Sequence, residues 1–380
     1  MSRILVGTCS WTDPSLIESG RFYPPGVSSA AERLRFYAAR FPLVEVDATY
    51  YAPPDPRTAR LWVERTPDDF VFDVKAFGLL TGHAVQAARL PRWLRERLPD
   101  ELLAKGRFYR RSAPDDVVEA VWQLHRDALA PLQDAGKLGA VLFQFPPWFV
   151  RSAENEAYLR ELPGRLPGLR VAVEFRGGGW MSEESAPGSL ATLEEAGLAY
   201  VTVDEPQGFR SSTPPLAAAT TDLAYLRLHG RNADTWEART PRSADRFKYL
   251  YSEEELLGWI PSVHELAERA GTVHVLFNNN FEDWGLRNAR RMAQLLGVAR
   301  EPDADSEGGD AEGRTPAGGG AHGQSAPDVD RQSATDGSGQ TALDLGGQTA
   351  LDVGGQTALD VGGQTALDVA VDVDGGGGGG

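Results

Sequence analysis

Short apolar segments recur along residues 1–300, and most are separated by stretches in which apolar side chains follow a helical spacing. Within the short segments apolar and polar residues mostly alternate, which is the pattern of β-strands. Eight strands are predicted in this way, at residues 4–11, 44–50, 70–76, 140–145, 171–176, 199–205, 225–230 and 273–280.

Helices are predicted between most of these strands, for example at residues 28–41, 252–271 and 286–297. Ser252 and Glu255 form the sequence pattern of a capping box, and Pro261 is expected to kink or split the helix that follows. Eight strands alternating with helices predict the α/β class and one (β/α)8 TIM-type barrel. A doubly wound open sheet is the alternative, although no Gly-rich turn follows the first strand.

An insertion is predicted between the third and fourth strands, because about 64 residues separate Ala76 from Ala140 and one helix needs far fewer. Its first part, Gly78–Pro114, has a net charge of +5. One interpretation is a lid or basic shelf that draws an anionic substrate to the barrel mouth. The other is a solvated helical excursion.

The composition changes near Val298. Residues 301–380 hold 21 of the 42 Gly and a net charge of -13, which leaves -3 for residues 1–300. The unit "GQTALD" recurs here with Gln at 340, 348, 356 and 364, and it offers too little apolar surface to offset the entropy of ordering. We predict a barrel over residues 1–298 and a disordered, low-complexity acidic tail over residues 299–380. A short calcium-binding β-roll or an interaction tail is the alternative.

The single cysteine, Cys9, excludes an internal disulfide framework and any zinc site built from several cysteines. No basic and apolar leader opens the chain, and no run approaches the ~18 apolar residues of a membrane span. We therefore expect a cytoplasmic protein without membrane association.

The polar residues of seven predicted strands share one face. In the seventh strand, Leu226 and Leu228 lie on one face, and Arg227 and His229 lie on the other. Because helices cover the outside of a barrel, the apolar face is expected to point outward and the polar face inward. The rule predicts an inward set of Glu45, Asp47, Asp73, Lys75, Gln144, Glu174, Arg176, Thr202, Asp204, Arg227, His229, His274 and Asn278.

Most of this inward set falls at the C-terminal ends of the strands, where barrel active sites lie. Burying such charges is unfavourable unless they pair or meet a ligand. A ligand site is therefore predicted at this rim, and a self-paired ionic plug is the alternative. Arg227 sits deeper than His229 and is the candidate for a structural counter-ion.

The predicted rim offers acid/base chemistry through Glu174 or Asp204 with His229. Lys75 is a candidate for a Schiff base, and an ion pair with Asp47 or Glu45 is its alternative role. Aromatic residues near the mouth are candidates for stacking on a sugar or a base: Trp11, Tyr50, Tyr51, Trp148, Trp180 and Trp236. The predicted substrate-binding residues are Asp47, His83, Gln144, Arg176, Arg227, Arg231, Asn278 and Trp11.

No cofactor is firmly implied by these residues. A divalent metal held by His83, His229 and carboxylates is an alternative. A multi-zinc site of the kind found in endonuclease IV-type barrels needs more imidazoles than this rim supplies.

Eight ordered motifs of the chain resemble the YecE-like family, also known as domain of unknown function 72. They are "GTCSWTD", "VEVDATYY", "FVFDVKA", "LTGH", "LFQFPP", "VAVEFR" with Trp180, "YLRLHGRN" and "LFNNN" with Asn288. The resemblance covers residues 1–298 and implies a TIM-type barrel without an established reaction. The second motif departs from the family pattern, because Asp47 adds a charge where the family often has Asn.

The leading hypothesis is an enzyme, a hydrolase or a lyase, that acts by acid/base chemistry at the C-terminal mouth of the barrel. Its predicted substrate is a small anionic or polyhydroxylated molecule that contains phosphate or sugar. The first alternative is a nucleic-acid-binding protein or endonuclease IV-like nuclease, which the net charge of -3 over residues 1–300 disfavours. The second is a non-catalytic ligand sensor or scaffold whose tail binds partners.

Overall fold

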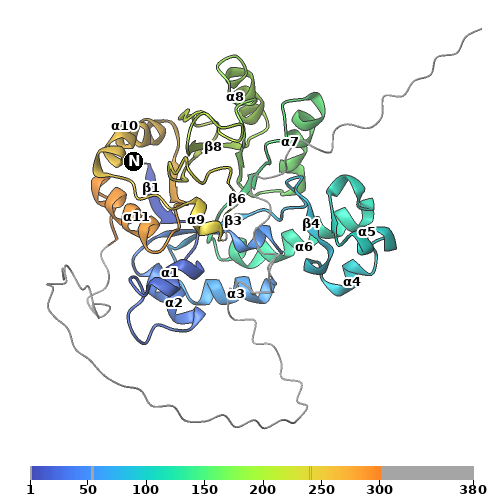
Figure 1. Ribbon diagram of the computed structural model, residues 1–380, viewed down its shortest axis with the longest axis horizontal. Helices are drawn as coiled ribbons and strands as arrows, with labels where there is room; N and C mark the ends of the chain where they lie inside the picture. Colours follow the sequence, from blue (N-terminus) through green and yellow to red (C-terminus); the bar gives the residue numbers. More distant parts are fainter. Residues whose placement is uncertain (1, 53–54, 239, 241, 301–380) are drawn as a thin grey trace, which may run out of the picture.

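Eight parallel strands close into a barrel in the computed structural model, which describes residues 2–52, 55–238, 240 and 242–300 (Figure 1). The closed order confirms the predicted (β/α)8 barrel, and each strand lies within or beside a segment that the sequence pattern predicts. Around the barrel the strands are β1 (Arg3–Thr8), β2 (Leu43–Val46), β3 (Val71–Lys75), β6 (Leu138–Gln144), β7 (Val171–Glu174), β8 (Ala199–Asp204), β9 (Leu223–Leu228) and β10 (Thr272–Phe277).

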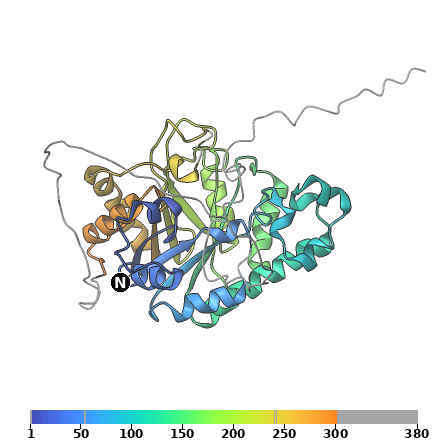
Figure 2. The ribbon, with the colours of Figure 1, turned by 60° about the horizontal axis from the view of Figure 1, so that its bottom comes forward.

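Helices follow the strands and cover the outside of the barrel, as Figures 1 and 2 show. They are α2 (Ala30–Ala38), α3 (Pro56–Glu64), α6 (Asp115–Asp134), α7 (Ala153–Arg165), α8 (Ala186–Glu195), α10 (Glu253–Arg269) and α11 (Trp284–Leu295). Two short helices, α1 (Pro14–Ser19) and α9 (Ser243–Arg246), lie in the segments after β1 and β9.

Helix α10 begins at the predicted capping box. The Glu255 backbone N–H donates to Ser252 Oγ at 3.2 Å, and the Ser252 N–H donates to the Glu255 carboxylate at 2.8 Å. This reciprocal pair satisfies two amides that the first turn leaves without helical partners. Pro261 does not split the helix, which runs from Glu253 to Arg269.

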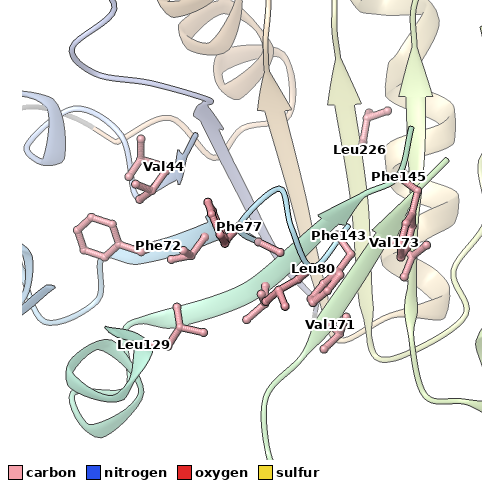
Figure 3. Close-up of a cluster of buried hydrophobic side chains, with 14 of the residues drawn as sticks. Val44, Phe72, Phe77, Leu80, Leu129, Phe143, Phe145, Val171, Val173 and Leu226 are labelled. Atoms are coloured by element: carbon pink, nitrogen blue, oxygen red, sulfur yellow. The ribbon is translucent and has the colours of Figure 1, made fainter. Parts of the chain in front are cut away.

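Two apolar layers position the site. The outer layer lies between strands and helices, and Figure 3 shows Phe72 of β3, Phe143 of β6 and Val173 of β7 among its members. The inner layer lies in the barrel interior and consists of Leu5, Leu43, Val71, Ala140, Leu142, Ala172, Ala199, Val201, Val203, Leu223, Tyr225 and Leu276, together with Cys9. Charged side chains lie among these residues, since Arg227 is level with Val203 and Leu276.

The insertion between β3 and β6 forms a small lobe beside the barrel. It contains β4 (Val85–Gln86), β5 (Arg107–Phe108), α4 (Arg92–Arg95), α5 (Asp100–Lys105) and the short 3-10 helices η2 (Ala87–Arg89) and η3 (Arg110–Ser112). In both ribbon views α4 and α5 project to the side, whereas α9 lies over the centre of the barrel in Figure 1. Helices α4 and α5 therefore do not form the predicted lid.

Several basic residues of the lobe pair with carboxylates at the surface, as a solvated excursion would. Arg92 contacts Glu96 at 2.7 Å, and Lys105 contacts Glu101 at 2.7 Å. Among the described residues of the insertion, His83 near its start lines the pocket at the barrel mouth. Across the described residues, every helix is too short or too polar to traverse a bilayer. The prediction for the tail concerns residues beyond 300, which lie outside the described part of the chain.

Candidate functional site

Five buried charged side chains form a continuous chain of ion pairs across the barrel interior. Arg227 on β9 contacts Glu45 at 2.6 Å and Glu174 at 2.5 Å. Arg176, two residues beyond Glu174, contacts that carboxylate at 2.8 Å and Glu205 at 2.6 Å. All five lie in or just beyond strands whose even spacing turns every second side chain inward. The interior charges therefore do pair with one another, as the ionic-plug alternative requires.

The three carboxyl groups of this chain differ strongly in proton affinity. Burial raises the pKa of Glu174, but Arg227, Arg176 and His229 outweigh burial and hold the pKa well below its usual range. Burial raises the pKa of Glu205 to about 8, against the lowering effect of Arg176. Burial raises the pKa of Glu45 to about 8 as well, against the lowering effect of Arg227. Glu45 and Glu205 therefore bind a proton more readily than Glu174 does.

His229 is a neutral imidazole inside this network. Burial and the nearby charge of Arg176 lower its pKa to about 3. The Asn278 amide contacts His229 Nδ1 at 2.8 Å, and Glu174 lies 3.3 Å from Nε2. If the Asn278 nitrogen donates to Nδ1, the ring proton lies on Nε2 and faces the Glu174 carboxylate. His229, Glu174 and Asn278 thus meet as predicted, at a point below the open pocket.

Strand β8 departs from the predicted inward set. Val203 pairs laterally with Arg227, and Val201 pairs with Tyr225. Neighbouring residues in a parallel register point to the same side, and Arg227 points inward, so the two valines point inward as well. The prediction that Asp204 faces the barrel interior is therefore wrong, and Thr202 also lies on the outer face.

Asp204 instead holds Arg231 outside the barrel interior. Its carboxylate accepts from Arg231 Nε at 3.0 Å and from the Tyr251 hydroxyl. The predicted pocket role of Arg231 is not supported, because its guanidinium also turns to Glu255 at 3.2 Å. The inward carboxyl group at the end of β8 is Glu205, the next residue.

An open pocket lies at the mouth beside the ends of β6 and β7 and contains about 470 Å³ of space between atoms, part of it continuous with solvent. The predicted residues that it brings together are His83, Gln144 and Arg176, together with two of the predicted stacking residues, Trp148 and Trp236. The other lining residues are Pro146, Pro147, Ser211, Arg246 and Phe247.

Lys75 lies on the opposite side of the mouth. Its ammonium contacts Asp47 at 3.4 Å and lies 5.1 Å from the centre of the Tyr50 ring. Asp47 also lies 3.9 Å from Arg227. These contacts match the ion-pair alternative for Lys75, and a lysine held as an ammonium is a poor nucleophile for Schiff-base formation.

Two predicted aromatic residues belong to the outer apolar layer. Trp11 packs edge-on against Trp62, with 6.1 Å between ring centres. Trp180 stacks on Phe175 at 4.5 Å. The prediction that Trp11 binds substrate is therefore not supported by its position, since it does not line the pocket.

One group of metal-type ligands occurs among the described residues. Cys9, Glu45 and Asp47 place ligand atoms within 4.8 Å of one another. Arg227 already contacts both carboxylates, and burial together with the Glu45 charge raises the pKa of the Cys9 thiol well above its usual value. Arg227 and Lys75 already compensate the carboxylates, and the thiol is protonated, so this group is a poor site for a metal cation. His83 and His229, the predicted metal-binding pair, do not belong to it.

Sequence reasoning missed three residues at the mouth. Ser211 and Arg246 lie on long segments that follow β8 and β9, where no strand or helix period predicts direction. Glu205 lay within a predicted strand, and its signal was the pair of adjacent acidic residues, of which either could face inward. The choice between them depends on the register of β8 against β9, which the alternation pattern does not contain.

The raised pKa of Glu205 predicts a pH-dependent stability. Between about pH 4.5 and 8 the folded state keeps the Glu205 proton, whereas the unfolded chain releases it. The contribution of Glu205 to the free energy of unfolding is therefore complete below about pH 4.5 and is lost as the pH rises to about 8. Glu205→Gln should therefore flatten the fall in unfolding free energy over pH 6–8, by up to about 1.4 kcal/mol per pH unit. Urea denaturation at several pH values measures it. Glu254→Gln, on the exposed face of α10, is the control, and equal slopes in all three proteins contradict the prediction.

Comparison with known proteins gives consistent matches over the barrel. Residues 5–309 match the family described as "Protein of unknown function DUF72". The UPF0759 protein YunF of Bacillus subtilis (strain 168) is 32% identical over 299 residues, which cover 78% of this chain and 95% of that protein. A DUF72 family protein from Thermotoga maritima MSB8 is 31% identical, with a TM-score of 0.60 and coverage of 78% and 99% of the two chains. A DUF72 family protein from Enterococcus faecalis V583 is 27% identical, with a TM-score of 0.63 and coverage of 79% and 99%.

Proposed function

The chain belongs to the DUF72 family of proteins of unknown function, and from its own site we propose that the barrel mouth binds a small anionic substrate and transforms it by acid/base chemistry. The observation that carries this proposal is the pair of guanidinium groups, Arg176 and Arg246, that line one pocket. Cations that share a concave site attract a ligand of opposite charge. A hydrolase or a lyase is the reaction class that fits a site of this kind.

Arg246 supports the anion assignment because it lacks a carboxylate partner among the described residues. Burial and the charge of Arg176 lower its pKa, and its Nε atom is buried without a hydrogen-bond partner. One terminal nitrogen donates to the Ala238 carbonyl at 3.2 Å. An anion between Arg176 and Arg246 would relieve both the repulsion and the missing hydrogen bond.

His83 supplies the base in this proposal. The Thr81 hydroxyl donates to the Gly78 carbonyl at 3.0 Å, so it accepts from His83 Nδ1 at 2.8 Å. The imidazole is then left with an unprotonated Nε2, the form required of a general base. Burial, Lys75 and Arg176 lower its pKa to about 3. A bound anion opposes the effect of the two cations and raises the pKa of His83 toward the working range of a base.

Glu205 is the proton reservoir of the same site. It does not line the pocket, but it contacts Arg176 at 2.6 Å and accepts from the Thr213 backbone N–H at 2.6 Å. Loss or gain of the Glu205 proton changes the charge next to Arg176. Glu205 is therefore a positioning residue, because it acts on a ligand only by holding the Arg176 guanidinium in place. An anion held by Arg176 is therefore sensitive to the proton on Glu205.

The first experiment measures anion binding by calorimetry, with inorganic phosphate and sulfate at low ionic strength. Arg246→Gln should weaken phosphate binding roughly ten- to hundredfold, because a hydrogen bond to a charged group contributes about 1.5–3 kcal/mol. Arg242→Gln is the matched control: Arg242 precedes the same short helix, is exposed and pairs with Glu18. Absence of saturable anion binding, or equal losses in both variants, overturns the proposal.

The second experiment addresses the chemistry. Phosphate esters and carboxylates that bind the protein are screened for turnover, with His83→Gln as the test variant. Turnover by the wild type that His83→Gln abolishes, while phosphate binding persists, is the expected outcome. Binding without any turnover across the screen would support the non-catalytic sensor alternative instead.

A further inference from the structure

The walls of the mouth outside the two guanidinium groups are mostly aromatic. Tyr51 and Tyr50 meet edge to face at 5.0 Å, and Tyr50 meets His83 at 5.2 Å. His83 in turn meets Trp148 at 5.7 Å. These four rings form a row that leads from the solvent-exposed rim to the pocket.

The two ends of this row offer ring surface to solvent. Trp148 is 40% exposed and Tyr51 is 55% exposed. The indole nitrogen of Trp148 lies 3.4 Å from the Gly82 carbonyl, and this contact holds the ring in one orientation. An exposed tryptophan that is held in place beside a concave pocket is a stacking surface for a ligand.

Tyr51 stands within the charged mouth although water reaches it. Desolvation by the surrounding walls and the charge of Asp47 raise the pKa of its hydroxyl, and Arg246 and Arg89 oppose them. Through Tyr50 and His83 the row of rings connects Tyr51 to Trp148, which lines the pocket of the guanidinium pair.

The opposite wall is aromatic as well. Trp236 and Phe247 both line the pocket, with 6.3 Å between their ring centres. The guanidinium of Arg176 lies 5.3 Å from the centre of the Trp236 ring, which fixes the indole beside the anion site. A ligand bound to Arg176 therefore lies directly against an aromatic wall.

Two neutral polar side chains of the pocket are already engaged. Gln144 Nε2 donates to Glu174 at 2.6 Å, and Ser211 Oγ donates to Glu237 at 2.9 Å. The unpaired groups, Arg246 Nε and Trp236 Nε1, are N–H donors that suit the anionic group, so several hydroxyl groups of a sugar would compete with the anion for them. A flat apolar ring requires no such partners.

We infer that the substrate carries a planar aromatic ring next to its anionic group, with the anion on Arg176 and Arg246 and the ring stacked on Trp148. This inference rests on the proposed function and narrows its substrate class from polyhydroxylated molecules to aromatic anions. The pocket opens to solvent beside Trp148, so the ring lies on the exposed indole face while the anionic group enters between the arginines.

The test compares four probes by calorimetry: phenyl phosphate, glucose 6-phosphate, glycerol 3-phosphate and inorganic phosphate. Phenyl phosphate should bind roughly tenfold more tightly than glycerol 3-phosphate, because stacking of one ring contributes about that much affinity. Trp148→Ala should remove this gain and leave inorganic phosphate binding within about twofold. Trp148→Phe should retain most of the gain.

Trp93→Ala is the matched control, since Trp93 on α4 is 51% exposed and does not line the pocket. Equal affinity for phenyl phosphate and glycerol 3-phosphate overturns the inference, and so does a gain that survives Trp148→Ala. Glucose 6-phosphate binding as tightly as phenyl phosphate overturns the aromatic assignment. If any of these results is obtained while phosphate binding still depends on Arg246, the aromatic inference is wrong but the proposed function is retained. If the protein binds no anion at all, the inference and the proposed function are both wrong.

Discussion

Replacing Arg227 by leucine is expected to lower the free energy of unfolding by about 3–5 kcal/mol, because removal of one partner leaves a buried charge without compensation. Arg227 is fully buried and contacts two fully buried carboxylates, Glu45 and Glu174. Glu174 keeps Arg176 in the variant, but Glu45 keeps only the Tyr225 hydroxyl, at 2.8 Å. Urea denaturation monitored by circular dichroism measures the loss.

The loss should grow as pH rises above about 8. Burial already raises the pKa of Glu45, and Arg227 is the strongest opposing group. Without it, the folded state holds the Glu45 proton more tightly while the unfolded chain releases it, so stability is lost as pH rises. Adding Glu45→Gln to Arg227→Leu should therefore remove most of this pH dependence.

Arg92→Leu is the control for the Arg227 variant. Its side chain is 84% exposed and pairs with Glu96 on α4, and a surface ion pair contributes about 0–1 kcal/mol. If Arg227→Leu destabilises the protein no more than Arg92→Leu does, the interior chain of ion pairs does not stabilise the fold.

The Arg227→Leu variant should also lose part of its phosphate binding, because Arg227 and Arg176 share the Glu174 carboxylate.

The plug and the ligand site are two ends of one network. Glu45 and Arg227 lie deep and satisfy each other, as a plug requires. Arg176 belongs to the same network through Glu174, yet it also lines the open pocket. Because Arg176 is tied to two carboxylates, its guanidinium is held in place before any ligand arrives, which reduces the ordering that binding requires.

The barrel and most of its inward face could be predicted from alternation alone. In β2, β3, β6, β7, β9 and β10 the charged and amide side chains point inward, and the larger apolar ones near them pack under helices, so the alternation gives the direction. Strand β8 fails this rule because its inward positions carry valines, Val201 and Val203, while polar Thr202 and Asp204 face outward. Where both faces of a buried strand carry apolar residues, the pattern does not give the direction.

The binding residues of the mouth could not be predicted by the same means. Arg246 and Trp236 reach the pocket from the segment between β9 and α10, which has only one short helix, α9. A loop has no period from which direction follows, and its path depends on contacts far apart in sequence. His83 could be proposed because the family motif "LTGH" marked it, not because of any pattern in the chain.

Replacing Gly7 by alanine is expected to destabilise the barrel by at least about 3 kcal/mol, beyond most overpacking changes. Gly7 on β1 pairs with Leu43 on β2, and this pairing closes the barrel. An added Cβ would lie 2.0 Å from the Leu43 carbonyl oxygen, so the two backbones would have to separate. The Tyr37 hydroxyl donates to the same oxygen at 2.9 Å and accepts from the Thr8 N–H at 2.9 Å, so these bonds would be strained as well.

The matched control is Gly258→Ala on the exposed face of α10, where no atom lies within 4 Å of the added Cβ. This change should stabilise the protein by about 0.5–1 kcal/mol, because alanine loses less conformational entropy in a helix. Thermal unfolding of both variants gives the comparison. Because β2 also carries Glu45 and leads to Asp47, separation of β1 from β2 should weaken phosphate binding too. A Gly7→Ala protein as stable as the wild type would mean that β1 and β2 can move apart at this point without disturbing the ion pairs above them.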